Sequence, residues 1–274
     1  MLLEKSIELP GYNQQRKCRE GWMIYNKNDK YLGKSLEVYG EFSDGEVEVF
    51  RKLIPSGGFV VEVGANMGAH TVAFANLVGR NGVVIAFEPQ RLMYMTLCAN
   101  VAINSLAQAY CRNEAVSNAP GELRIPDLDP NAELNFGGYS IEMKNEGTPT
   151  NVITLDQLMI PQCDFVKIDV EGMEVKVLAG GEQFIKKHRP ILYVENDRRD
   201  QRDQIIQMID ALDYVMYWHL PPLFNPDNYN GVSENIFGDL RSTNMLCMPR
   251  EKGPTIHGLE LIDPSKKYEI GLQE

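Results

Sequence analysis

Residues 59–68 read Phe-Val-Val-Glu-Val-Gly-Ala-Asn-Met-Gly, a short β-branched run followed by a turn with a glycine at each end. The apolar run predicts a buried parallel strand, and the residues from Gly68 to Val78 predict a helix with one apolar face. Gly64 and Gly68 let the main chain turn tightly and approach a ligand without a Cβ in the way. This strand-turn-helix unit is therefore the first candidate for a ligand site.

The same alternation of strand and helix continues along the chain. Further strands are predicted at 83–87, 109–116, 165–170, 191–195, 214–219 and 244–248, and further helices at 91–104, 173–187 and 202–212. Such alternation is typical of a doubly wound α/β sheet. Residues 117–150 interrupt it with many Gly and Pro residues, which predict antiparallel hairpins.

The pattern divides the chain into three parts. Residues 1–56 are expected to form an N-terminal extension that caps the core, with short strands or turns up to Tyr39 and a helix from Ser43. Residues 57–250 form the α/β domain, with the hairpin insertion near 117–150, and residues 251–274 form a C-terminal tail. The apolar tail residues Leu259, Leu261 and Ile262 are expected to dock either on a partner, as in a homo-oligomer, or on the protein's own sheet.

Composition excludes several classes of function. With 27 Lys and Arg against 38 Asp and Glu, the net charge is −11, which disfavours binding to nucleic acid. The one basic cluster, Arg198, Arg199 and Arg202, alternates with aspartates and predicts a solvated helix start. Five dispersed cysteines predict neither disulfides nor a zinc site. No apolar run approaches the ~18 residues of a membrane span, and no signal peptide is evident, so we expect a cytoplasmic protein.

Glu88 ends the second predicted strand, roughly 20 residues beyond the glycine turn, where a carboxylate can accept hydrogen bonds from both hydroxyls of a ribose. NAD and S-adenosylmethionine both carry such a ribose. Dinucleotide sites favour a second glycine where this chain has Asn66, because that glycine makes room for a pyrophosphate. Asn66 could instead bond an amino-acid moiety, and Glu62 could lie near its ammonium group, which favours S-adenosylmethionine.

Charged residues also follow the strand at 165–170. Strand alternation places Lys167, Asp169 and Glu171 on one side at the carboxyl end of the sheet. The alternative is a purely structural role, in which Lys167 and Asp169 form an ion pair and Glu171 caps a helix. If the next strand is a neighbour, Glu195 and Asn196 converge on Asp169.

That cluster could act as a general base for a hydroxyl, or it could bind Mg²⁺ or another divalent cation through Asp169, Glu195 and Asn196. His219, at the end of a later strand, is a second candidate base.

Together these features resemble the FkbM family of S-adenosylmethionine-dependent methyltransferases over roughly residues 40–248. The matching pieces are 61–71 (Val-Glu-Val-Gly-Ala-Asn-Met-Gly-Ala-His-Thr), 86–89 (Ala-Phe-Glu-Pro), Asn100 with Asn104, 154–156 (Thr-Leu-Asp), 167–172 (Lys-Ile-Asp-Val-Glu-Gly), 194–195 (Val-Glu) and 242–246 (Ser-Thr-Asn-Met-Leu). One departure is Glu62, where similar sequences usually carry Asp; the longer side chain should still reach.

The resemblance implies a Rossmann-like class I methyltransferase: an α/β fold with a seven-stranded, mostly parallel sheet, its last strand antiparallel, and helices on both faces. It implies methyl transfer, commonly to an oxygen on a sugar of a glycan or on a polyketide-type natural product. Gly64, Ala65, Asn66 and Gly68 would line the methionine part of the cofactor, Glu88 would hold the ribose, and Glu114 and Ala115 would lie near the adenine. The expected cofactor residues are Glu62, Gly64, Ala65, Asn66, Gly68, Thr71, Glu88, Pro89, Glu114, Ala115 and Asp169.

By the same resemblance, Asp169, Glu171 and Glu195 would face a small-molecule or saccharide acceptor. The reaction is expected to be an in-line displacement, which depends chiefly on proximity and orientation. We expect Asp169 to act as base or metal ligand and Lys167 to tune its charge, with Glu171 and His219 as further catalytic candidates. A loop around Tyr139 and the N-terminal aromatic residues are expected to stack on the acceptor.

Three alternatives stay open at this point. The methyl group could go to a nitrogen or a carboxylate instead of a hydroxyl. The chain could be a Rossmann oxidoreductase that uses NAD. It could also be a module that binds the cofactor without turnover.

Overall fold

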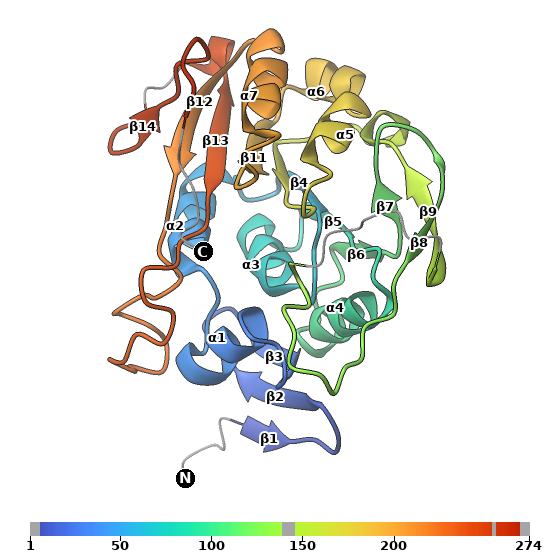
Figure 1. Cartoon of the computed structure of the whole chain (residues 1–274), viewed down its shortest axis with the longest axis vertical. Coiled ribbons are helices and arrows are strands. Elements are labelled where there is room, and N and C mark those ends of the chain that lie inside the picture. The colour runs from blue at the N-terminus through green and yellow to red at the C-terminus, as the bar shows by residue number, and fades with distance from the viewer. Residues whose placement is uncertain (1–5, 139–145, 254–255, 269–274) are drawn as a thin grey trace.

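An eight-stranded sheet forms the centre of the protein (Figure 1), whose computed structural model describes residues 6–138, 146–253 and 256–268. In spatial order its strands are β14 (Glu260–Leu261), β12 (Tyr214–His219), β13 (Asn244–Pro249), β11 (Ile191–Glu195), β10 (Phe165–Ile168), β4 (Phe59–Val63), β5 (Val83–Phe87) and β6 (Ala109–Arg112). From β11 to β6 all neighbours are parallel, whereas β13 is antiparallel to both β11 and β12. The predicted fold class is therefore confirmed, and the two-residue β14 adds an eighth strand to the expected seven.

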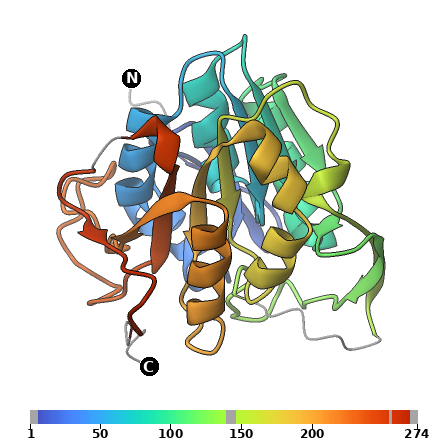
Figure 2. The same cartoon turned by 90° about the horizontal axis from the view of Figure 1, so that it is seen from above.

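Helices cover both faces of this sheet (Figure 2). One layer contains α2 (Asp44–Leu53), α3 (Ala69–Val78) and α4 (Arg91–Ile103); the other contains α5 (Glu174–Ala179), α6 (Glu182–His188) and α7 (Arg202–Ala211). Val60 and Val61 are adjacent on β4, yet they belong to separate apolar clusters, one under each helix layer. Successive strand residues point to opposite faces, so a strand buried on both sides must be apolar at nearly every position.

The N-terminal segment forms a second, antiparallel sheet from β1 (Ser6–Glu8), β2 (Asn13–Lys17) and β3 (Trp22–Asn26), followed by α1 (Leu32–Tyr39). The helix α1 lies where the sequence predicted only short strands or turns. Strand β3 docks on α4 through two side-chain amides. Asn100 accepts from the Ile24 amide at 2.6 Å and donates to its carbonyl at 2.9 Å, and Asn104 makes the same pair with Trp22 at 2.8 and 2.7 Å.

Two predicted elements are each divided in the structure. The strand predicted at 109–116 separates into β6 and β7 (Ala115–Val116), and β7 joins a small sheet with β8 (Gly121–Ile125) and β9 (Thr148–Ile153). In that sheet β8 pairs antiparallel with β9, and β7 pairs parallel with it. The helix predicted at 173–187 separates into α5 and α6 around Gly180, where a Cβ would lie 2.1 Å from the Ser117 carbonyl oxygen. Tyr139 lies outside the described residues.

Arg202 corrects the prediction of a solvated helix start, because only 1% of its surface is exposed. Its guanidinium donates to the carbonyls of Asn196, Asp197 and Tyr268 and lies 5.9 Å from the centre of the Trp218 ring. These contacts satisfy a charge that would otherwise be costly to bury. Arg202 therefore ties the end of β11 to the C-terminal tail.

The C-terminal tail packs on the protein's own sheet. Leu261 pairs with Tyr217 of β12, and Ile262 is buried among the core residues under α7. The short 3-10 helices η1 (Leu155–Gln157) and η2 (Arg250–Lys252) complete the described elements. Within the residues that the structure describes, there is no helix of the length and apolarity that crossing a membrane requires.

The docking of β3 on α4 gives the first prediction. Asn100 is fully buried, so Asn100→Ala would leave the amide and carbonyl of Ile24 and the carbonyl of Met67 without their partner. We expect the free energy of unfolding to fall by about 2–4 kcal/mol in urea titrations. The exposed Asn118→Ala should change it by less than about 0.5 kcal/mol. An equal effect of both variants would show that the Asn100 amide does not hold the N-terminal sheet.

Candidate active site

The carboxyl ends of β4 and β10 meet where the direction of the strand order reverses, because β5 follows on one side and β11 on the other. Open α/β sheets bind their ligands beyond the strand ends at such a position. A cavity of about 360 Å³ lies there. It is lined by the ends of β4, β5, β10 and β11 and by residues within 31–46, 135–138 and 223–244.

The glycine turn after β4 is shaped by close packing of the chain on itself. Gly64 has a φ of 88°, and a Cβ there would lie 1.7 Å from the carbonyl oxygen of Asp169. Gly68 has a φ of 89°, and its Cβ would meet Leu97 of α4 at 2.7 Å. Both glycines therefore allow contact between elements, and Gly64 in addition brings the ends of β4 and β10 together at the mouth of the cavity.

Glu88 lies at the end of β5 with its carboxylate fixed from two sides. Oε2 accepts from the Asn66 amide at 2.7 Å, and Oε1 accepts from the Gln90 amide at 2.8 Å. Burial raises the pKa of Glu88 to about 7. A carboxylate offers about four acceptor positions, so two remain for a ligand in the cavity.

Beneath the cavity, Lys167 is 2% exposed and is surrounded by carboxylates. Its Nζ lies 2.6 Å from Oδ2 of Asp169, and Glu62 is its register partner on β4. Burial opposes the charge of Lys167, but Asp169, Glu46 and Glu62 raise its pKa above the ordinary value. Burial raises the pKa of Glu62 to about 8 despite Lys167 and the hydrogen bond from Thr71. One buried ammonium thus serves several carboxylates.

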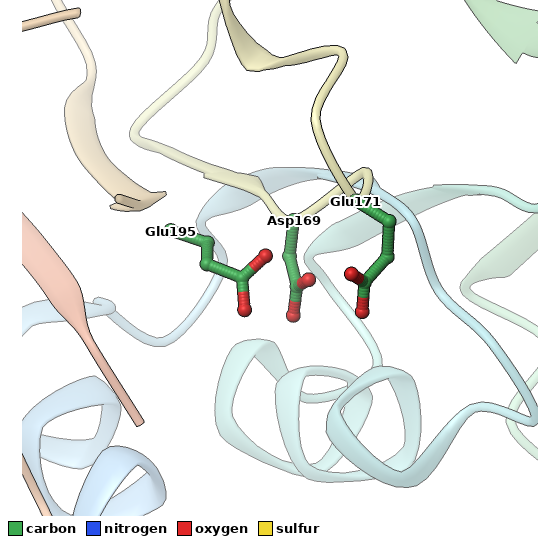
Figure 3. A group of neighbouring side chains, drawn as sticks. All are labelled: Asp169, Glu171 and Glu195. Carbon is green, nitrogen blue, oxygen red and sulfur yellow. The ribbon is translucent and has the colours of Figure 1, made fainter. Parts of the chain in front are cut away.

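Asp169, Glu171 and Glu195 place three carboxylates side by side, pointing the same way (Figure 3), with oxygen atoms within 4.8 Å of one another. Glu171 reaches this position because its φ is 53°, so strand alternation does not account for it. Burial would raise the pKa of Asp169, but Lys167 lowers it below the ordinary value. Burial and the neighbouring negative charges raise the pKa of Glu171 to about 8 and that of Glu195 well above its usual range.

The structure gathers many of the predicted residues at this cavity. Those that line it are Glu62, Gly64, Ala65, Asn66, Glu88, Pro89, Lys167, Asp169, Glu171 and Glu195. The other predicted residues belong to the described part of the chain but lie outside the lining: Gly68, Thr71, Glu114, Ala115, Asn196 and His219.

The contacts of these outer residues are internal. Thr71 donates to Glu62, and Glu114 pairs with Arg112 at 2.6 Å. Asn196 contacts the Arg202 carbonyl at 3.4 Å and the Met245 sulfur at 3.3 Å. His219 Nδ1 lies 2.7 Å from the Tyr193 hydroxyl, and burial lowers the pKa of His219 to about 4.

Sequence reasoning missed two buried residues of the lining, Glu46 and His70. Glu46 lies in the first turn of α2, where its carboxylate accepts a hydrogen bond from the Ser43 hydroxyl at 2.8 Å. His70 has its Nε2 3.9 Å from Glu46, and burial lowers the pKa of His70 to about 3. His70 lies within residues 61–71, which resemble the FkbM family, and this resemblance was the signal that could have identified it.

A second missed group, Leu223, Leu240, Arg241 and Ser242, comes from the segment between β12 and β13. Ser242 belongs to the matching motif 242–246, but the rest of the segment has no helix or strand period, so its sequence gave no indication of where Leu223, Leu240 and Arg241 lie.

The fold and the cavity together define a Rossmann-like protein of the methyltransferase type, with the sheet order, glycine turn and strand-end carboxylate already described. Residues 62–216 match the Methyltransferase FkbM domain. Because the match spans more than half of the chain, the protein belongs to the FkbM methyltransferase family, whose members are S-adenosylmethionine-dependent enzymes.

Solved structures with related folds have low sequence identity. A Clostridium thermocellum protein provisionally described as an rRNA methylase is 11% identical, covering 80% of this chain and 95% of its own, with a TM-score of 0.48. Methyltransferase FkbM from Methylobacillus flagellatus is 15% identical over 80% of this chain and 55% of its own, with a TM-score of 0.46. The O-methyltransferase TomG from Streptomyces achromogenes is 11% identical over 76% and 78%, also with a TM-score of 0.46.

The contact of Gly64 with Asp169 gives the second prediction. Gly64→Ala should lower the free energy of unfolding by about 3 kcal/mol or more, because the new Cβ overlaps a main-chain oxygen at a positive φ. Gly57→Ala is the matched control: its φ is 79°, but nothing lies within 4 Å of the added Cβ. Only the backbone term of about 1–2 kcal/mol is expected there. Equal losses in thermal or urea unfolding would contradict a close contact at the end of β4.

Proposed function

We propose that this enzyme transfers the methyl group of S-adenosylmethionine to a hydroxyl oxygen of a saccharide-like or natural-product-type small molecule. The observation that carries the proposal is the composition of the single cavity described above. It combines the glycine turn and Glu88 on one side with Asp169, Glu171 and Glu195 on the other. Residues suited to bind a nucleoside and residues suited to accept a proton thus line the same cavity.

For the cofactor, Glu88 accepts hydrogen bonds from the two ribose hydroxyls, because its main-chain contacts hold the carboxylate at the end of β5. The turn from Gly64 to Asn66 lines the methionine part. Glu62 lines this part of the cavity beside Lys167, and burial raises its pKa to about 8, so a ligand ammonium group close by would favour loss of its proton and formation of an ion pair. Glu114 and Ala115 lie outside the cavity lining, so we do not assign them the adenine.

For the acceptor, Asp169 takes the hydroxyl proton while the oxygen attacks the methyl carbon in line with the leaving sulfur. Lys167 keeps Asp169 ionised at neutral pH, which a base requires. Glu171 and Glu195 hold protons more tightly, because burial and mutual repulsion raise the pKa of each. Neighbouring carboxylates with separated pKa values are typical of acid–base sites.

A divalent cation is the second form of this proposal. The oxygen atoms of Asp169, Glu171 and Glu195 suit Mg²⁺, and one oxygen of Glu195 has no hydrogen-bond partner among the described residues. Asn196, proposed from the sequence as a ligand, lies outside the cavity lining; its amide nitrogen contacts Arg202 and Met245, while its Oδ1 has no hydrogen-bond partner among the described residues. A bound cation would lower the pKa of the acceptor hydroxyl.

The rival functions fit the cavity less well. NAD needs room for a pyrophosphate, but Asn66 fills the position of the second glycine, and a Cβ on Gly137 would lie 2.4 Å from its amide. A module that only binds the cofactor would not need three carboxylates on the far side. Transfer to an amine would need no base, and the Asp169 variant below separates that case from transfer to oxygen.

Glu88 gives the third prediction. Glu88→Ala should weaken S-adenosylhomocysteine binding at least about tenfold in calorimetry, because two charge-assisted hydrogen bonds are lost. NAD should bind neither protein. In the wild type, affinity should fall as the pH drops below about 7, since Glu88 then takes up a proton and can accept fewer bonds. Glu88→Gln should not show this pH dependence between pH 6 and 8, values chosen as roughly one unit either side of that pKa. Binding of NAD in place of the sulfur compounds would remove the proposed cofactor.

Asp169 gives the fourth prediction. With methyl hexosides and methyl deoxyhexosides as acceptors, Asp169→Asn should lower kcat by about 10²–10⁴-fold, while S-adenosylhomocysteine affinity stays within a few-fold. Treatment with EDTA distinguishes the two forms of the proposal. If Asp169 accepts the proton directly, the methyl-transfer rate is unchanged, whereas an enzyme that depends on a cation loses activity until Mg²⁺ is restored. If Asp169→Asn transfers methyl groups at the wild-type rate, Asp169 neither accepts the proton nor holds a required cation.

A further inference from the structure

The wall of the cavity next to Glu195 comes from the segment 220–243 between β12 and β13. Leu223, Leu240, Arg241 and Ser242 of this segment line the cavity. The two ends of the segment pair with each other: the Leu223 amide donates to the Leu240 carbonyl, and the Ser242 amide donates to the Pro221 carbonyl, both at 3.0 Å. We call residues 220–243 the acceptor wall. Asn244, just beyond this segment, pairs with Glu195 on β11, so the segment lies beside a carboxylate that the proposed function assigns to the acceptor.

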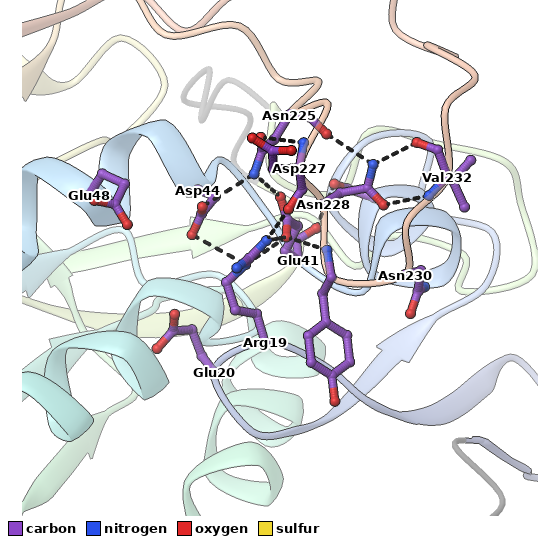
Figure 4. Close-up of polar contacts among 12 residues, drawn as sticks. Arg19, Glu20, Glu41, Asp44, Glu48, Asn225, Asp227, Asn228, Asn230 and Val232 are labelled. Atoms are coloured by element: carbon purple, nitrogen blue, oxygen red, sulfur yellow. Dashed lines mark hydrogen bonds and ion pairs between the residues drawn. The ribbon is translucent and has the colours of Figure 1, made fainter. Parts of the chain in front are cut away.

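Beyond this paired base, side-chain hydrogen bonds join residues 224–239 to the N-terminal segment in the described structure. The attachment centres on Glu41, which is only 6% exposed (Figure 4). Its Oε1 accepts from the Asn225 side chain at 2.9 Å, and its Oε2 accepts from the Tyr229 amide at 2.8 Å and from Arg19 Nε at 2.7 Å. Arg19 in turn donates to the Asp227 carbonyl at 2.6 Å. One carboxylate therefore holds two separate turns of the wall.

A second set of contacts comes from the helix just before Glu41. The Tyr39 hydroxyl donates to the Glu234 carbonyl at 2.9 Å and accepts from the Ile236 amide at 2.8 Å. Its ring lies 5.4 Å from that of Phe224 and 5.9 Å from that of Phe237. Figure 1 shows the wall in orange beside α1 in blue. The wall and the N-terminal segment thus pack as one unit, and Tyr31 and Phe42 of that segment line the cavity as well.

We propose that Glu41 is a positioning residue that sets acceptor binding by fixing the acceptor wall against the N-terminal segment. The inference rests on the proposed function, because it assigns this side of the cavity to the acceptor. Hydrogen bonds to an ionised group are roughly twice as strong as neutral ones, so a buried carboxylate with several donors is a firm anchor for a segment without regular structure. The cofactor side receives its residues from β4 and β5, and no contact of Glu41 reaches them among the described residues.

The test compares Glu41→Ala, Glu41→Gln and Asn225→Ala with Glu37→Gln. Glu37 lies on α1 close to Glu41 in sequence, but its side chain pairs only with Lys34 at the surface in the described structure. Amide hydrogen exchange within the wall should be at least about tenfold faster in Glu41→Ala, because local opening is then easier, and Glu41→Gln should be intermediate. Asn225→Ala should act in the same direction, and Glu37→Gln should match the wild type.

Kinetics on the same variants test the consequence for function. With the methyl hexoside or deoxyhexoside that supports turnover, Glu41→Ala should raise the acceptor KM about tenfold with kcat changed less than about twofold. Affinity for S-adenosylhomocysteine should stay within about twofold, and exchange in β4 and β5 should not change.

Unchanged exchange in the wall would overturn the proposal, and so would faster exchange with an unchanged acceptor KM. A parallel loss of S-adenosylhomocysteine affinity would also overturn it, because Glu41 would then support the whole fold. Failure of the wild-type protein to bind S-adenosylhomocysteine would instead refute the proposed function itself.

Discussion

The buried ammonium group of Lys167 determines how the floor of the cavity can be built. A charge buried on a sheet face requires opposite charges nearby, and Asp169, Glu62 and Glu46 supply them from β10, β4 and α2. Burial raises the pKa of Glu62 and of Glu46, and Lys167 only partly offsets that rise. Asp169, in direct contact with Lys167, stays ionised, while Glu62 has a pKa of about 8. Different proton affinities in one cavity thus follow from the burial of the carboxyl groups and from their distances to a single lysine.

Much of the central fold could be predicted from the sequence because its signals are local. Strands β4, β5, β11 and β12 begin and end at the predicted residues, since a strand buried on both faces must be apolar at nearly every position. The convergence of the carboxylates at the carboxyl ends of β5, β10 and β11 could also be predicted, because parallel strands end at the same edge of a sheet. What failed was the prediction of breaks. Gly180 and Gly181 lie between α5 and α6; a glycine is required at 180 because the Ser117 carbonyl oxygen lies 2.1 Å from where a Cβ would be, and no local pattern reports that contact.

The residues that helices contribute to the cavity and to its supports were difficult to recognise in the sequence for a related reason. Glu46 and His70 point into the cavity from helices α2 and α3, and their roles depend on which face of each helix packs against the sheet. Asn100 and Asn104 could be recognised only as part of a motif. The structure explains the pair: spaced four residues apart on one helix face, their amides replace a neighbouring strand for β3. Arg202 was misjudged because its partners are main-chain carbonyls, which every sequence contains.

The Glu41 contacts also bear on the order in which the molecule can be assembled. Glu41 and Asn225 are 184 residues apart in the sequence, and Arg19 and Asp227 are 208 apart. Contacts of such long range close late in folding, because a large loop must be ordered before they form. During synthesis, β4 and β5 leave the ribosome long before the wall does. A growing chain can therefore pair β4 with β5, the strands that precede Gly64 and Glu88, before the segment 220–243 closes one side of the cavity. The cavity is complete only when the two distant parts of the polypeptide have met.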